Sequence, residues 1–125
     1  MADLIYKELC YKIIGVAFEV HNSLGAGLKE KVYADALEVI FKEEDISYSR
    51  EYYYSVKVRD KVVAKRYFDF IIEDKIVVEV KIGYDNYREA CNQIFEYLKS
   101  SGLKLGLIIR FTKYGAKTKR IPNIY

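Results

Sequence analysis

The amino-terminal part of the chain carries two hydrophobic patterns of helical period. Between Asp3 and Leu24, apolar residues recur at spacings of three and four, which predicts an amphipathic helix of about 18 residues with Asp3 as its N-cap. A second stripe of the same period includes Val32 and Ile40 and ends near the acidic residues 43–45. We therefore expect two successive helices before the first strand.

The middle of the chain changes to the two-residue period of β-strands. Residues 51–58 alternate between apolar and other side chains, and a turn at 59–61 leads to a second strand at 62–72. A polar turn at 73–75 then leads to a third strand at 76–81. This order predicts an antiparallel meander of three strands.

A third helix and a buried strand complete the pattern. The helix is expected to start at Asp85 or Asn86 and to end at Gly102, because glycine is favoured just after the last helical turn. Residues 103–111 form a nearly continuous apolar run, typical of a strand covered on both faces, and 117–121 form a short last strand. The predicted fold is α+β, with a mixed β-sheet flanked by helices.

Charged residues interrupt the hydrophobic hairpin formed by the second and third strands. Asp69 and Glu79 are each five residues from Asp74 at the centre of the turn, so we expect them to lie opposite one another. Lys81 shares the face of Glu79, because side chains alternate along a strand. The opposite face is predicted to be wholly apolar, with Phe68, Phe70, Ile72, Ile76, Val78 and Val80.

Two interpretations account for these charges. In the first, Lys81 forms a salt bridge to Asp69 or Glu79 on a solvated face, an interaction that contributes roughly 0–1 kcal/mol. In the second, the two carboxylates bind a divalent metal, since carboxylates about 5 Å apart suit a hard cation such as Mg²⁺. The lysine could then orient a metal-bound water or help to deprotonate it.

Two motifs in this chain resemble those of a known superfamily. Asp69, nine further residues and then Glu79-Val80-Lys81 resemble the signature of the PD-(D/E)XK nuclease superfamily. The earlier segment Gly27-Leu28-Lys29-Glu30-Lys31-Val32-Tyr33 resembles the GxxExxY motif, which names a largely uncharacterised family within that superfamily. The resemblance extends from about His21 to Arg120, and the two motifs occur in the order that the family has.

The resemblance implies a fold, an activity and a set of site residues. The fold is a restriction-endonuclease-like αβββαβ core, here preceded by an extra amino-terminal helix. The activity is Mg²⁺- or Mn²⁺-dependent hydrolysis of DNA. Asp69, Glu79 and the Val80 carbonyl would bind the metal, Glu30 would complete the site directly or through water, and Lys81 would hold the attacking water.

Further residues are assigned supporting roles by the same resemblance. Gln93 and Tyr97 resemble a Q-x-x-x-Y element that some exonuclease-like branches carry beside the metal site, and Tyr33 lies one turn from the first-turn glutamate. The chain departs from the family at Ala90, where a histidine is frequent, and at Tyr67, where an arginine is frequent. These departures concern substrate positioning and leave the acids and the lysine intact.

Two of the singled-out residues also have purely structural explanations. A histidine near a helix end, such as His21, more often interacts with free backbone carbonyls than acts as a catalyst. A glutamate in the first turn of a helix, such as Glu30, is favoured by the helix dipole in any protein. Pattern alone leaves both alternatives open.

Length and composition indicate one globular domain, residues 1–125. The chain is 51% hydrophobic and 31% charged, which is typical of a soluble protein. No apolar run approaches the ~20 residues that span a bilayer, and no signal-peptide pattern is present, so we expect a cytoplasmic protein. Cys10 and Cys91 both fall at apolar helical positions and are predicted to be free thiols.

The net charge of +3 is unevenly distributed. All 18 acids lie at or before Glu96, whereas the chain from Tyr97 onward has seven bases and no acid. This region could contact phosphates through a basic face, or it could be a solvated tail. The predicted nucleic-acid contacts are Lys113, Lys117, Lys119 and Arg120.

Three functional hypotheses follow. The first is a metal-dependent nuclease acting on DNA, in repair, recombination or defence. The second is a non-catalytic module that binds nucleic acid or a protein partner and retains the nuclease fold. The third is a metal-independent scaffold that forms a homodimer through an exposed edge strand. The complete set of Asp69, Glu79 and Lys81 favours the first, because acids near a phosphate have no use in a binding module.

Overall fold

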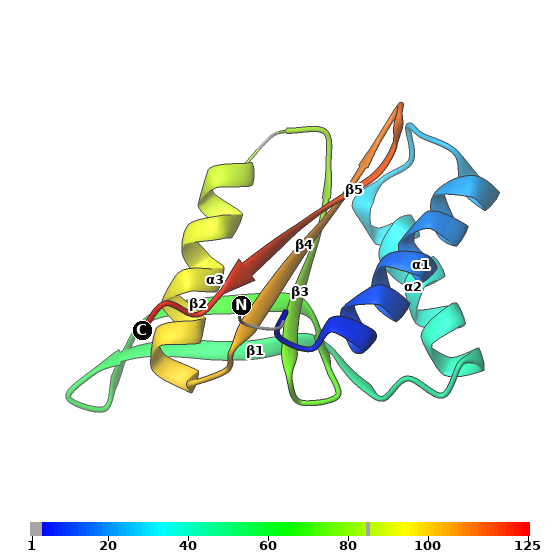
Figure 1. The fold of residues 1–125 in the computed structure, drawn as a ribbon. Coiled ribbons are helices and arrows are strands. Elements are labelled where there is room, and N and C mark those ends of the chain that lie inside the picture. Colours follow the sequence, from blue (N-terminus) through cyan, green and yellow to red (C-terminus); the bar gives the residue numbers. More distant parts are fainter. Residues whose placement is uncertain (1–3, 85) are drawn as a thin grey trace.

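The computed structural model describes residues 4–84 and 86–125 as a five-stranded sheet with helices on both faces (Figure 1). The helices are α1 (Lys7–Leu24), α2 (Glu30–Glu43) and α3 (Tyr87–Ser101). The strands are β1 (Tyr48–Val58), β2 (Lys61–Ile72), β3 (Ile76–Ile82), β4 (Leu105–Thr112) and β5 (Gly115–Pro122). The predicted α+β class and the predicted order of elements are both confirmed.

The strands lie in the sheet in the same order as in the chain. β3 and β4 are parallel and every other neighbouring pair is antiparallel, so the sheet is mixed. Parallel neighbours need a crossover connection, which α3 provides on one face of the sheet. α1 and α2 cover the other face (Figure 1).

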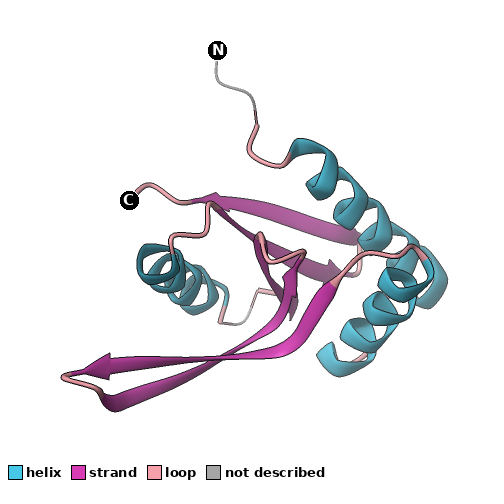
Figure 2. Ribbon diagram, turned by 90° about the horizontal axis from the view of Figure 1, so that it is seen from below, coloured by secondary structure: helices cyan, strands magenta, loops and turns pink. Residues whose placement is uncertain are grey.

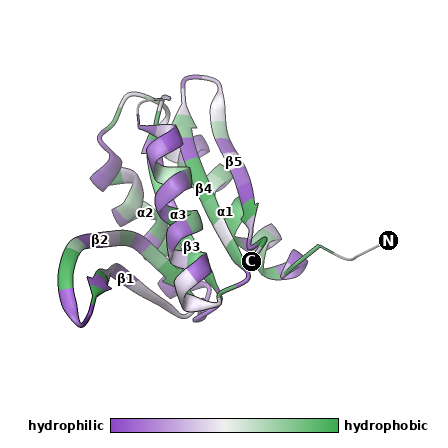
Figure 3. Cartoon of the chain, turned by 90° about the vertical axis from the view of Figure 1, so that its left-hand side faces the viewer, coloured by the Kyte–Doolittle hydropathy of each residue, from purple (hydrophilic) through white to green (hydrophobic). Residues whose placement is uncertain are grey.

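The sheet separates two hydrophobic clusters. On the α1/α2 side, Leu37 and Phe41 pack against Val78, whereas on the α3 side Ile94 packs with Ile108. β4 contributes to both clusters, as its apolar run predicts (Figure 3). α3 presents a largely hydrophilic side to solvent (Figure 3).

The two amino-terminal helices differ in detail from the prediction. Asp3 lies outside the described residues, and α1 begins only at Lys7, with Tyr6 in the N-cap position. In α2, Val32 is 42% exposed although it was placed in the buried stripe. The stripe is shifted because Tyr33 is fully buried, where its ring stacks on Phe111 with 4.2 Å between centroids. The buried residues of α2 are Tyr33, Ala34, Leu37 and Phe41.

The ends of the other elements are close to those expected. β1 starts at Tyr48, three residues before its predicted start, and β5 is a full partner of β4. Asp85 lies outside the described residues, and Asn86 takes the N-cap position of α3 without a side-chain hydrogen bond. The glycine stop is confirmed: Gly102 has φ 78° and donates its N–H to the Leu98 carbonyl.

A change of face at Asp69 was not predicted. Phe70 packs in the cluster under α1 and α2, whereas Phe68 packs in the cluster under α3. The prediction that these two side chains share one face is therefore wrong. The cause is a local irregularity: Glu51, opposite Asp69, has φ 52°, and the β1–β2 ladder omits this pair. Beyond this point the β1–β2 hairpin runs away from the body of the fold (Figure 2).

In the described part of the chain, no helix is long and apolar enough to cross a membrane. Cys10 is buried and Cys91 is half-buried, and both are free thiols as predicted.

Candidate active site

Asp69 and Glu79 meet where the ladder between β2 and β3 ends. The last ladder pair is Phe70 with Val78, so the next position places the two acids opposite one another. The Asp69 N–H donates a hydrogen bond to Glu79 Oε1 at 2.8 Å, and the Val80 N–H donates one to Asp69 Oδ2 at 2.7 Å. Carboxylates thus replace main-chain partners at this point, and each side chain is held by the backbone of the other strand.

Glu79 is buried and Asp69 is half-buried. Glu79 is only 7% exposed. Burial, followed by repulsion from Asp69, raises the pKa of Glu79 to about 8. Burial also raises the pKa of Asp69, although its hydrogen bond from Val80 acts in the opposite direction.

Lys81 and Glu30 contribute opposite charges to this site. Lys81, half-buried on β3, lowers the pKa of both acids, and Glu30, at the start of α2, raises both. Within the described chain, no ion pair within 4 Å joins Lys81 to Asp69 or Glu79. The interpretation as a salt bridge on a solvated face is therefore wrong.

The set of side chains that could bind a divalent cation is small. Among residues 4–84 and 86–125, no three His, Cys, Asp or Glu side chains converge closely enough to hold a metal. Glu30 thus stands apart from the pair on the sheet. Two carboxylates still suit Mg²⁺, because this ion keeps several waters and needs few protein ligands. The Val80 N–H points to β2, so the Val80 carbonyl, on the same edge of the strand, faces β2 as well.

The residues assigned supporting roles lie in the surrounding core. Tyr97, on the buried side of α3, is almost fully buried. Its ring contacts those of Phe68 and Tyr54, with centroids 5.0 and 4.9 Å apart. Burial raises the pKa of Tyr97 above its usual value. Gln93 is half-buried one turn earlier on the same helix.

Tyr33 lies on the opposite side of the sheet and holds the loop before α2. Its hydroxyl donates a hydrogen bond to the Gly25 carbonyl at 2.7 Å and accepts one from the Leu28 N–H at 3.3 Å. This loop leads directly to Glu30, so Tyr33 restrains the start of the helix that carries that acid.

A row of cations crosses the sheet beside the acids. Lys81 on β3 is in register with Arg110 on β4, and Arg110 is in register with Lys117 on β5. The Arg110 guanidinium lies 4.2 Å from the Tyr84 ring centroid and 4.7 Å from that of Tyr87. Its Nη1 is buried without a hydrogen-bond partner among the described residues. Sequence reasoning missed this row, because only the register of β3 against β4 brings its members together.

The predicted nucleic-acid contacts do not form one face. Lys117 and Lys119 alternate along β5 with Arg120, so they project to the other side of the sheet. The Arg120 guanidinium donates a hydrogen bond to the Ile5 carbonyl at 2.6 Å. Arg120 is thus engaged with the segment before α1.

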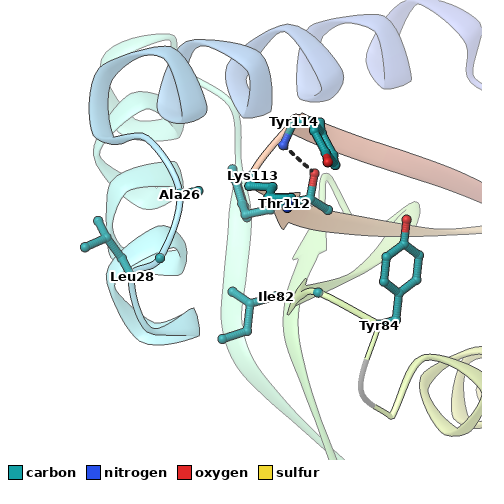
Figure 4. A pocket seen from close by; sticks show the side chains of 10 residues that line it. Ala26, Leu28, Ile82, Tyr84, Thr112, Lys113 and Tyr114 are labelled. Atoms are coloured by element: carbon teal, nitrogen blue, oxygen red, sulfur yellow. Dashed lines mark hydrogen bonds between the residues drawn. The ribbon is translucent and has the colours of Figure 1, made fainter.

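An open cavity of about 610 Å³ lies at the carboxyl end of β3, and the candidate acids and Lys81 do not line it (Figure 4). It is enclosed by the loop before α2, the end of β3 and the β4–β5 turn. Lys113 lies at this turn, so the fourth predicted contact borders the cavity. The lining residues are Ala26, Gly27, Leu28, Ile82, Gly83, Tyr84, Phe111, Thr112, Lys113 and Tyr114.

His21 stabilises the same turn. Its Nε2 lies 2.7 Å from the Thr112 carbonyl oxygen, a hydrogen bond that joins the end of α1 to the end of β4. This contact supports the structural explanation for His21, in which a histidine near a helix end binds a backbone carbonyl.

Comparisons with known proteins agree with this architecture. The crystal structure of SSO0001 is similar, with a TM-score of 0.57 and 20% sequence identity over 94% of the present chain. The chain spans 57% of the length of that protein, and the likeness shows the fold alone. No curated protein sequence matches. The model of the PD-(D/E)XK nuclease superfamily matches residues 7–121. The chain therefore belongs to the PD-(D/E)XK nuclease superfamily.

Proposed function

We propose that this protein is a Mg²⁺- or Mn²⁺-dependent nuclease that hydrolyses phosphodiester bonds in DNA. Membership of the superfamily implies a nuclease-like protein with a nucleic-acid substrate, and such nucleases generally use divalent metals. The observation that carries the proposal is the pair of acids, buried Glu79 and half-buried Asp69, each held by the opposite strand with Lys81 beside them. Isolated buried carboxylates are costly, and a cation would offset that cost.

The proposed metal ligands are Asp69, Glu79 and the Val80 carbonyl. Each carboxylate accepts a backbone hydrogen bond through one oxygen, which leaves its second oxygen for a cation. Glu30 would act from α2 through water, since it stands apart from the other two acids. A bound Mg²⁺ would supply Lewis-acid polarisation of the phosphate and activation of a water molecule.

Lys81 has a different proposed role. Its charge acts on both carboxylates, yet it is tied to neither by an ion pair. The ammonium is therefore available to hold the attacking water and to stabilise the negative charge that develops on the phosphate.

The neighbouring residues fit supporting roles. Tyr97 packs on Phe68, which directly precedes Asp69, so we propose that it positions this part of β2. Gln93 lies one turn away on α3 and would assist in placing the substrate. The contact of Tyr33 with the loop before Glu30 supports assignment of the chain to the GxxExxY family.

Phosphate binding is proposed for the cations on the α3 face and at the β4–β5 turn. Lys117 continues the row that starts at Lys81, Lys119 lies two residues further along β5 on the same face, and Lys113 borders the cavity at the end of β3. Arg120 was also predicted to contact phosphates. Its hydrogen bond to the Ile5 carbonyl gives it a structural role instead.

A second candidate is a non-catalytic nucleic-acid-binding module. The separation of Glu30 from the acids on the sheet favours it, because the site is then less complete than a catalytic site requires. This candidate predicts metal-independent binding and no cleavage.

Titration of Mg²⁺ and Mn²⁺ against single-stranded, duplex and branched DNA and against RNA separates the candidates. We expect metal-dependent cleavage of DNA, abolished by Asp69→Ala. Cleavage that persists in Asp69→Ala, or none with any substrate at millimolar metal, would remove the catalytic assignment.

A further inference from the structure

The hairpin of β1 and β2 extends beyond the rest of the sheet (Figure 2). We call residues 55–66 the arm. Arg59 and Asp60 form its tip, with left-handed φ values of 48° and 64° that give a tight turn. Val58, Val62 and Val63 are exposed near the tip, so no other element of the described chain covers this end.

The arm has the highest density of positive charge in the amino-terminal two thirds of the chain. Five of its twelve residues are lysine or arginine, and Asp60 is its one acid. Arg66 is neutralised by Glu96 of α3 at 3.3 Å. The other four cations, Lys57, Arg59, Lys61 and Lys65, are exposed and form no ion pair within 4 Å with any described acid.

An aromatic pair connects the arm to the candidate active site. Tyr53 and Tyr67 face one another across β1 and β2, with ring centroids 5.3 Å apart, and are 45% and 60% exposed. Tyr67 precedes Asp69 by two residues, a separation of about 7 Å along a strand. Lys65 lies two residues further out, so cations and exposed rings run from the tip to the acids.

We propose that the arm binds duplex DNA, with its two strands in the major groove and its four free cations on the flanking phosphates. The chemistry selects a polyanion, since a ribbon with unpaired cations and one acid attracts phosphate backbones. The shape selects B-form DNA, whose major groove of about 12 Å admits a two-stranded β-ribbon. The deep, narrow groove of duplex RNA does not. The exposed valines can contact thymine methyl groups.

A second copy of the chain fits this surface less well. Two arms placed edge to edge would bring their unpaired cations together, and charged residues on an edge strand oppose such pairing. The proposal rests on the proposed function only in that the ligand is DNA. Binding through the arm requires neither a metal nor cleavage.

The test is DNA binding by the full chain in EDTA, measured by fluorescence anisotropy with a labelled duplex of about 20 base pairs at several salt concentrations. The arm variant carries K57A, R59A, K61A and K65A. The control variant removes the same number of exposed cations elsewhere, as K7A, K12A, K42A and K104A. Circular dichroism establishes that both variants are folded.

We expect the arm variant to bind duplex DNA about 10²-fold more weakly at low salt, with a salt dependence that is shallower by about 3 to 4 in log–log slope. The control variant should lose much less affinity. Equal losses in the two variants, wild-type binding of duplex RNA as tight as that of duplex DNA, or an arm variant that loses only self-association would overturn the proposal. Metal-dependent cleavage by wild type and Asp69→Ala tests the proposed function separately, because neither acid nor metal takes part in the EDTA measurement.

Discussion

At the scale of single residues, the decisive feature is a break in a hydrogen-bond ladder. Where the ladder between β2 and β3 ends, Glu79 accepts the Asp69 N–H and Asp69 accepts the Val80 N–H. These bonds hold both carboxylates in place before any ligand arrives, which favours a preorganised site. As a consequence, a buried acid, Glu79, lies beside a half-buried one, Asp69.

The first prediction concerns stability and pH in the absence of metal. The pKa of Glu79 is raised in the folded state, so its stabilising contribution is complete below about pH 4.5 and is lost as the pH rises through about 8. The free energy of unfolding should therefore fall as the pH rises from about 4.5 to about 8 and should level off above that. Glu79→Gln should be less sensitive to pH and, at the upper end, more stable than wild type by on the order of 2 kcal/mol.

Urea unfolding in EDTA at several pH values measures this effect. Glu89→Gln, on the exposed side of α3, is the matched control for loss of one carboxylate. A Glu79→Gln profile parallel to that of wild type would contradict the predicted titration.

The second prediction separates the acid from the lysine. Glu79→Ala removes a proposed metal ligand, so Mn²⁺ affinity and turnover should both fall, with partial recovery in excess metal. Lys81→Ala leaves the ligands in place, so Mn²⁺ should still bind while turnover falls by ~10²–10⁴.

Calorimetric Mn²⁺ titration and single-turnover DNA cleavage provide the two readouts, with Lys12→Ala as a control for loss of one exposed lysine. Wild-type turnover in Lys81→Ala would rule out its catalytic role.

At the scale of elements, the contact between α3 and β4 keeps the crossover helix close to the sheet. A Cβ atom at Gly106 would collide with the side chain of Ile94, which is fully buried. The absence of a side chain at Gly106 therefore sets the distance between helix and strand. At the start of the same helix, the Tyr87 ring lies against the Arg110 guanidinium of β4.

The third prediction tests this close approach. Gly106→Ala should destabilise the fold by about 1–3 kcal/mol, because Ile94 must move within a packed core. Gly15→Ala in α1 is the matched control: no atom lies within 4 Å of the added Cβ, and alanine favours a helix by about 1 kcal/mol. Thermal unfolding of both variants gives the comparison, and destabilisation of equal size would argue against a steric cause.

At the scale of the whole molecule, cations lie on two separate surfaces. One is the row of Lys81, Arg110 and Lys117 beside the acids, and the other is the arm. Arg120 belongs to neither, since it binds the carbonyl of Ile5. A substrate that touches both surfaces would pass over the candidate active site.

The fourth prediction concerns the two lysines that β5 presents on the same face as the row. K117Q combined with K119Q should lower the log–log salt slope of DNA binding by about 2, because each lost phosphate contact removes about 0.9. Arg120→Gln should change that slope little and should instead loosen the segment before α1.

Anisotropy at increasing salt and hydrogen exchange at residues 4–10 are the corresponding measurements. A slope change in Arg120→Gln as large as that of the double variant would return Arg120 to the DNA-binding surface.

Local sequence determined the elements and the chemistry of the site. The three- and four-residue periods, the alternation in the meander and the glycine at the end of α3 are properties of neighbouring residues, so helix and strand order could be read from them. The hairpin is equally local, and its symmetry about Asp74 was enough to pair Asp69 with Glu79. The family resemblance named the same acids and the lysine.

Tertiary packing decided what local patterns do not contain. α2 rotated away from its predicted stripe because Tyr33 stacks on Phe111, a residue far along the chain. The change of face between Phe68 and Phe70 depends on the interruption of the β1–β2 ladder at Glu51 and Asp69, and it places Phe68 in the cluster with α3 and Phe70 in the cluster with α1 and α2. The cationic row depends on the parallel register of β3 and β4, which are separated by a helix. Each of these outcomes rests on contacts between residues distant in sequence, and hydrophobic period specifies the face of an element but not its partner.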